Sequence, residues 1–397
     1  MKLKSIFRGD TGIWVVFFLL SLVSLAAVYS SIGLEAYTHR GPGPTGLFLK
    51  HLAIVVVTYV AIILLSRVNY RYFSRFAVLG YWASLVLLVI LLALGRRWVV
   101  IPGMGQFQPS EIAKVMLIIF VARIIALKKE QTQDLGTFIQ LLFYIALVAG
   151  FVMPENFSTA ALIFLSCYIM MYLGGVNKRY WWRVFAVGVV IVVGFLAVSY
   201  YRYEKYIISG EAQENVIERQ ATWGHRVYSW LNPEENAMTQ ENIARMAIAR
   251  GGVFGKRVGN TIHGRLMTQA HNDFIYAIII EESGFIGAMI VFALYAIFYL
   301  RCIRLVKRCP GTFGKLTVAG FGTVIYLQAL VNMSVAVGAL PVTGQTLPFI
   351  SYGGTAYLFL GCGVGVIQAV AADVERQKEA QAVAQKQETP TTNDGDD

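Results

Sequence analysis

The sequence of 397 residues is 56% hydrophobic and only 14% charged, and its mean hydropathy is +0.58. Because a soluble domain carries about 25% charged residues, this composition excludes an ordinary soluble protein. The net charge of +11 is dispersed between apolar segments, so it does not indicate nucleic-acid binding.

Apolar runs of about 18–22 residues recur along the chain, and each can cross a ~30 Å hydrocarbon layer as a helix. The runs lack the short alternating pattern of a membrane β-barrel. The first run has no small-residue cleavage site, so we expect it to be retained. The sequence predicts an all-α integral membrane protein with about ten transmembrane helices, at residues 13–32, 49–66, 77–95, 110–127, 136–153, 157–175, 180–201, 274–300, 313–340 and 350–371.

Lysine and arginine are distributed unevenly between the connections. The short odd-numbered connections hold only Arg40, Lys50, Arg96 and Arg97, whereas the N-terminal arm and the even-numbered connections hold many more. Basic residues concentrate on the cytoplasmic side of membrane proteins. The distribution therefore predicts that both termini are cytoplasmic.

We expect one membrane domain over residues 1–373 and a disordered cytoplasmic tail over 374–397, because the tail is polar and lacks aromatic residues. A large outer loop, 202–272, joins the seventh and eighth helices, and a loop of that length is usually functional. Within it, "TQENIARMAIARGG" predicts a short helix with Thr239 as N-cap and Gly251 at its end. Ile243, Met246 and Ala247 share one face, which could pack on the bundle or lie in the interface.

The outer ends of the third, fifth and ninth predicted helices are followed by polar segments rich in Pro and Gly, which indicates a polar cavity open to the outside. Gln108, Glu111 and Lys114 form one stripe at the start of the fourth helix. Two interpretations remain open: Glu111 and Lys114 neutralise each other within the helix, or Lys114 reaches a carboxylate or phosphate across the cavity.

The stretch "QAHNDFIYAIIIEESG" places several polar side chains around the start of the eighth helix. Asp273 could be its N-cap, a general base, or both. His271 is more often a hydrogen-bonding neighbour than a catalyst. Glu281 and Glu282 are rotated away from Asp273 around the helix, so we expect them to be structural partners of hydroxyl or basic side chains.

Glycine pairs and "GCGVG" at 361–365 are expected to be close helix-packing positions. The four cysteines lie in predicted helices or on the cytoplasmic side, so no disulfide is expected. No metal-ligand spacing occurs.

Five motifs in order along the chain resemble the SEDS family, whose members include FtsW, RodA and SpoVE. They cover nearly the whole chain and are most similar to the division members, with the elongation members as the alternative. The motifs are "FQPSEIAK", "RVYSWLNP", "ARGGVFGKRVGN", "HNDFIYAIIIEESG" and "LPVTGQTLPFISYGG". The chain departs from the family pattern at Glu155–Asn156 and in the residues before Asp273.

The resemblance implies an inverting peptidoglycan glycosyltransferase that joins lipid II units on the outer face of the bacterial inner membrane and releases undecaprenyl pyrophosphate. Asp273 matches the family's essential aspartate. The motifs also imply a set of substrate-binding residues: Lys114, Glu111, Arg226, Gln108, Ser110, His271 and Ser351. No cofactor is certain, and a divalent cation, Mg²⁺ or Mn²⁺, is left open. The implied partners are a class B penicillin-binding protein and divisome or elongasome regulators.

Two other classes of function fit ten helices with polar residues. A lipid II flippase or transporter should show polar groups on both sides and an internal repeat, neither of which is evident here. A non-catalytic scaffold of a cell-wall synthase would not need Asp273.

Overall fold

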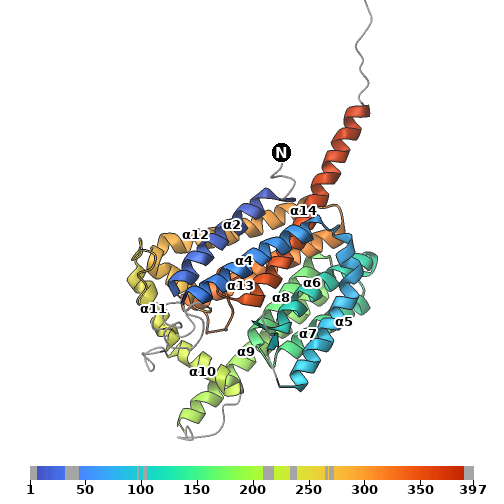
Figure 1. Ribbon diagram of the computed structural model, residues 1–397. Coiled ribbons are helices and arrows are strands. Elements are labelled where there is room, and N and C mark those ends of the chain that lie inside the picture. The colour runs from blue at the N-terminus through green and yellow to red at the C-terminus, as the bar shows by residue number, and fades with distance from the viewer. Residues whose placement is uncertain are drawn as a thin grey trace, which may run out of the picture.

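The computed structural model describes residues 7–31, 44–95, 98–101, 105–208, 219–232, 239–263, 267 and 272–388. These residues are almost entirely helical (Figure 1). The elements are α2 Thr11–Ser31, α4 Pro44–Arg67, α5 Arg71–Ala93, β1 Val99–Ile101, β2 Gly105–Phe107, α6 Pro109–Leu127, the 3-10 helix η1 Lys129–Gln131, α7 Leu135–Val152, α8 Phe157–Leu173, α9 Lys178–Ile208, α10 Arg219–Leu231, α11 Gln240–Gly251, α12 Ile275–Arg308, α13 Thr312–Ala336 and α14 Gly354–Glu388.

Each of the ten apolar segments predicted to span the membrane lies for most of its length in one helix. Among the described residues, eight helices are long and apolar enough to cross a bilayer: α2, α4, α5, α7, α9, α12, α13 and α14. The other two are α8, with 17 residues, and α6, whose 19 residues include Glu111, Lys114 and Arg123. The predicted all-α integral membrane fold is confirmed.

The glycines of "GCGVG" let α14 approach its neighbours closely, as the sequence predicts. A Cβ at Gly361 would lie 2.1 Å from Thr58 Cγ2 on α4, and one at Gly363 would lie 2.7 Å from Phe321 on α13. Neither distance is compatible with a side chain, so both glycines are packing positions.

The two ends of the bundle differ in character. α10 and α11 gather at one end, and α14 projects beyond the rest at the other (Figure 1). At that second end Asp10, just before α2, exchanges hydrogen bonds with Gln368 of α14 and lies 3.8 Å from Arg301 of α12. The start of α2, the late turns of α12 and the middle of α14 are therefore on one side.

The predicted disordered tail is wrong for its first part, because α14 continues to Glu388. Residues 374–388 are rich in Ala, Glu, Gln, Lys and Arg, which are strong helix formers and extend a helix that the bundle has already nucleated. The remaining residues of the tail lie outside the described part of the chain.

The connection between α9 and α12 contains two described helices where the sequence predicts one. α11 begins and ends as expected, with Thr239 Oγ1 accepting from Asn242 N at 3.4 Å. Ile243 and Ala247 are buried in a small cluster with the first turns of α12, whereas Met246 is 44% exposed. α11 therefore packs on the bundle. α10 was not predicted, although its apolar residues gather on one face at the helical period, a signal that sequence reasoning missed.

α12 is not the continuous helix that the sequence predicts. Gly284 breaks it, with φ 68° and ψ −168°, a conformation that L side chains rarely adopt. The break leaves backbone groups that pair with the segment after α11. Lys256 N and Arg257 N donate to the carbonyls of Glu281 and Glu282, and Phe285 N donates to Gly252 O at 2.9 Å.

Glu281 and Glu282 fasten the same segment through their side chains. Glu281 lies 2.6 Å from Arg250 Nη1 and also accepts from Thr261 Oγ1 and His263 Nδ1. Glu282 accepts from Ser30 of α2 and from Gly259 N. Such basic and hydroxyl partners are the kind that the sequence predicts, and burial makes their presence necessary.

Candidate functional site

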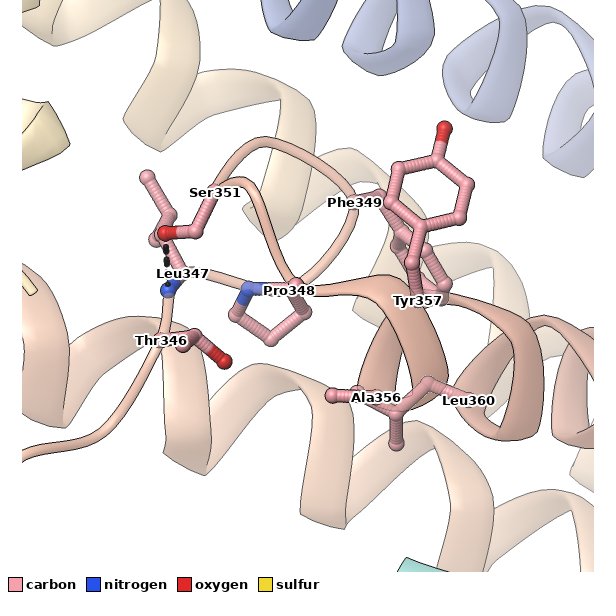
Figure 2. Close-up of a pocket in the computed structure, with 9 residues that line it drawn as sticks. Thr346, Leu347, Pro348, Phe349, Ser351, Ala356, Tyr357 and Leu360 are labelled. Atoms are coloured by element: carbon pink, nitrogen blue, oxygen red, sulfur yellow. Dashed lines mark hydrogen bonds between the residues drawn. The ribbon is translucent and has the colours of Figure 1, made fainter. Parts of the chain in front are cut away.

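The connection between α13 and α14 is the centre around which the polar groups gather. Residues 341–353 include Pro341 and Pro348, which cannot continue a helix, and the non-glycine residue Phe349 has φ 62°. The connection folds back into the bundle rather than lying on its surface. Figure 2 shows a small hollow between it and the start of α14, lined in part by Thr346, Ser351 and Tyr357 and without room for a water molecule.

Asp273 is positioned by its backbone. Phe274, which is buried, is the N-cap of α12 without a side-chain cap bond. The predicted capping role of Asp273 is therefore wrong, because the N-cap is the next residue and no side-chain cap bond forms at the start of α12. Among the described residues no side chain or backbone group hydrogen-bonds to the Asp273 carboxylate.

Two side chains hold the Asp273 segment against the α13–α14 connection. Asn332 of α13 donates from Nδ2 to Asp273 O at 2.9 Å and to Gln345 O at 2.7 Å. Ser351 donates to Asn272 O at 2.6 Å and accepts from Leu347 N at 2.8 Å, the second bond being visible in Figure 2. These bonds fix the position of the backbone from which the Asp273 side chain extends.

Arg226 faces the site from α10. Its Nη1 donates to Val342 O at 3.2 Å, and its guanidinium lies 5.4 Å from the ring centre of Trp223. Trp230, one turn further along α10, donates from Nε1 to Gly338 O at 2.9 Å. Two bonds thus dock α10 onto the connection that also holds Asp273.

The electrostatics of Asp273 combine burial with a nearby cation. Burial raises the pKa of its carboxyl from an ordinary value of 3.8 to about 6, and the positive charge of Arg226 acts in the opposite direction. A carboxyl with a pKa near neutrality is suited to accept a proton in catalysis.

Glu111 and Lys114 form the buried ion pair that the sequence leaves as one alternative. Lys114 Nζ lies 2.8 Å from Glu111 Oε2 and donates to Gln328 Oε1 of α13 at 3.2 Å. Gln328 in turn donates to Thr346 O at 3.0 Å. Lys114 is therefore linked through Gln328 to the same α13–α14 connection that holds the Asp273 segment.

Lys114 and the Asp273 segment bind side chains on successive turns of α13. Gln328 binds Lys114, and Asn332 binds the Asp273 segment. These two residues are four positions apart on α13, so they share a face and are separated by about 6 Å along the axis. The site consequently has two levels, with the carboxylate at the end of α13 and the lysine one turn deeper.

Further polar side chains line the interior around α8. Gln345 donates to Thr159 Oγ1 at 2.8 Å, and Asn156 caps α8 by accepting from Thr159 N at 3.1 Å. Ser110 Oγ and Ser158 Oγ are buried without a hydrogen-bond partner in the described structure. Unsatisfied buried hydroxyls are costly, and at a site they are suited to bind water or a polar ligand.

The structure places the remaining predicted residues as follows. Gln108 is the N-cap of α6 in extended conformation, without a side-chain cap bond. Ser351 commits its hydroxyl to the two backbone contacts described above. His271 lies outside the described residues. No group of three or more His, Cys, Asp or Glu side chains suited to hold a metal ion is present in the described part of the chain.

Sequence reasoning missed Asn332, Gln328 and Gln345. The first two are polar residues four positions apart inside an apolar segment, which is itself a signal for a buried polar face. Gln345 carries no such signal, since it lies in a connection that is already rich in polar residues.

Comparisons with known proteins give consistent results. The family model FtsW/RodA/SpoVE, described as cell cycle protein, matches residues 10–376. The chain is 27% identical over 390 residues to the probable peptidoglycan glycosyltransferase FtsW of Coxiella burnetii, covering 94% of this chain and 100% of that protein. It is also 27% identical over 341 residues to the peptidoglycan glycosyltransferase MrdB of Escherichia coli, covering 82% and 85%.

Two solved structures share the fold. A chain from a study of a peptidoglycan synthase complex that coordinates polymerization and crosslinking has a TM-score of 0.67 and 22% identity, covering 92% of this chain and 98% of that one. The rod shape determining protein RodA of Thermus thermophilus has a TM-score of 0.63 and 22% identity, covering 92% and 97%.

Proposed function

Because the chain belongs to the FtsW, RodA and SpoVE family of cell cycle proteins, we propose that it is a peptidoglycan glycosyltransferase that polymerises lipid II. The observation that carries this proposal is the placement of Asp273. Its carboxyl is partly buried, has a pKa raised to about 6 and lies within the field of Arg226. Two relatives that align with most of the chain are named peptidoglycan glycosyltransferases.

In the proposed reaction, Asp273 removes the proton from the 4-hydroxyl of the acceptor GlcNAc. The freed oxygen forms a bond to C1 of the donor MurNAc, and the bond from C1 to the pyrophosphate breaks. Undecaprenyl pyrophosphate leaves with the electron pair, and the α-linked donor becomes a β-1,4 product. A base positioned in this way contributes typically 10²–10⁴-fold to the rate.

The leaving pyrophosphate needs positive charge. Arg226 donates to the α13–α14 connection directly, and Lys114 is linked to it through Gln328. We assign Arg226 to the level of the carboxylate and Lys114 to the level one turn deeper. Ser110 and Ser158 are available to donate to substrate oxygens. Glu111 balances the charge of Lys114 when substrate is absent.

We further propose that the protein lies in the bacterial inner membrane with both termini cytoplasmic and the site facing outward. The distribution of lysine and arginine supports this orientation. A class B penicillin-binding protein is the proposed partner, because a structurally similar chain comes from a peptidoglycan synthase complex that coordinates polymerization and crosslinking. Division is the proposed role, since the FtsW relative aligns with more of the chain than the MrdB relative does.

The test uses purified full-length protein in liposomes with lipid II, with and without a class B penicillin-binding protein. We expect glycan chains from the wild type and none from Asp273→Ala, with both proteins equally folded by thermal unfolding. Transfer of lipid II between leaflets without polymer would instead identify a flippase. Polymerisation that is unaffected in Asp273→Ala would refute the assigned base.

A further inference from the structure

The segment that pairs with the broken part of α12 presents an unusual surface. Residues 253–262 expose four apolar side chains, of which Phe254 is 82% exposed and Val258 63%. Lys256 and Arg257 are also exposed, and neither has an ion-pair partner among the described residues. No carboxylate occurs between Arg250 and His263, so the patch is apolar and basic.

The depth of this segment follows from the length of α12. The part of α12 after its break at Gly284 runs to Arg308, about 24 residues or about 36 Å at 1.5 Å per residue, which already exceeds a hydrocarbon layer of about 30 Å. Arg301 is the first basic residue on the end away from Asp273. Counting back about 20 residues from it, the length of one crossing, leads to Glu281.

α2 gives the same depth independently. Asp10, before its first turn, lies beside Arg301, and Ser30, in its last turn, donates to Glu282. The interval from Asp10 to Ser30 is again about 20 residues, or about 30 Å. Both helices therefore place the hydrocarbon boundary on the Asp273 side at the level of Glu281 and Glu282.

The pairing brings the exposed segment to that boundary. The backbone N–H groups of Lys256 and Arg257 donate to the carbonyls of Glu281 and Glu282, so the backbone that carries the two cations lies at the boundary itself. Val253 pairs with Ile286 and therefore lies on the hydrocarbon side of the cations. There it continues the exposed apolar strip of α12 that includes Phe285, Met289 and Ile290.

We propose that residues 253–258 form a site for phospholipid headgroups of the leaflet on the Asp273 side. Phe254, Val253 and Val258 insert among the acyl chains, and Lys256 and Arg257 bind the headgroup phosphates. The charge fits this occupant, because lipid phosphates are anionic and concentrate at the depth where the cations lie. The backbone of the segment can enter this layer because its polar groups are paired with α12.

The depth of Phe254 is measured with a nitroxide at Phe254→Cys in Cys362→Ser protein, since the other three cysteines are buried. Vesicles contain phosphatidylcholine and phosphatidylglycerol, without lipid II. We expect the label to be accessible to oxygen and shielded from a water-soluble nickel chelate, like a label at the lipid-facing Ile290. Glu130→Cys supplies the water-exposed reference, and Val258→Cys repeats the measurement should the first variant not fold.

The cations are tested with a bimane at residue 254 and spin-labelled phosphatidylglycerol in phosphatidylcholine nanodiscs. The measured quantity is the fraction of spin-labelled phosphatidylglycerol that quenches half of the bimane fluorescence. Lys256→Gln and Arg257→Gln should each raise this fraction about fivefold. Lys307→Gln, at the far end of α12, should leave it unchanged. A label at 254 that is as open to nickel as the Glu130 reference overturns the proposal and leaves the patch to a protein partner. An equal shift from Lys307→Gln overturns it as well.

Discussion

At the scale of single residues, the acidity of Asp273 links burial to chemistry. A general base is active when deprotonated, so kcat/KM should rise with pH through about 6 and then level off. Arg226→Gln removes the cation that lowers the pKa, and the rise should therefore move to higher pH. Initial polymerisation rates across the range check both statements. Arg245→Gln, on the neighbouring α11, is the matched control and should not move the rise.

A double substitution at Glu111 and Lys114 distinguishes a structural role of their ion pair from a role in turnover. Lys114→Met leaves a buried carboxylate unpaired, which typically costs about 3–5 kcal/mol. Adding Glu111→Gln removes that charge and should restore the unfolding temperature. If Lys114 binds the pyrophosphate, turnover stays at least tenfold low in the restored protein. Recovery of turnover together with stability would mean that the pair has only a structural role.

Asn332 holds the backbone of Asp273 against the α13–α14 connection. Asn332→Leu should leave the carbonyls of Asp273 and Gln345 buried without a donor, at a cost of about 1–3 kcal/mol each. The Asp273 segment then loses its fixed position, so turnover should fall more than stability does. Thr323→Val on the same helix is the control, because the Thr323 hydroxyl has no partner in the described structure and its removal should change little. Equal effects of the two variants on turnover would contradict the positioning role.

At the scale of elements, the break in α12 determines how the end of the connection between α9 and α12 is attached. A Cβ at Gly284 would lie 2.2 Å from Val253 O, and the residue has a φ that favours glycine. Gly284→Ala should therefore destabilise the protein by about 1–3 kcal/mol and detach residues 252–259, which limited proteolysis would detect. Gly194→Ala on α9, where a Cβ meets nothing within 4 Å, should be neutral or slightly stabilising. Indistinguishable proteolysis of the two variants would show that the pairing does not hold the segment.

The elements also show what sequence reasoning can reach. Hydrophobic length identifies every long helix of the bundle, because burial in a membrane imposes it on each segment separately. Hydrophobic length does not identify the break at Gly284, since a Ser–Gly pair can also occur within an unbroken helix. The break exists because residues 252–257 supply the missing backbone partners, and these are distant in sequence.

At the scale of the whole molecule, the candidate site was only partly predictable for the same reason. Asp273, Lys114 and Arg226 stand out as charged residues at the ends of apolar segments. Their common neighbour, the α13–α14 connection, does not stand out, because its role depends on folding back between α13, α12 and α10. Asn332 and Gln328 hydrogen-bond to that connection. Only the packed bundle shows that they also bind the Asp273 segment and Lys114.

The most direct test of the account is the rate of lipid II polymerisation by Asp273→Asn in liposomes. The side chain keeps its shape and loses its basicity, so the account predicts a loss of at least about 10²-fold. The variant should be no less stable at pH 7, because a raised pKa means that the folded state holds the ionised carboxylate at a cost in stability. A stable Asp273→Asn protein that polymerises lipid II at the wild-type rate would contradict the central claim.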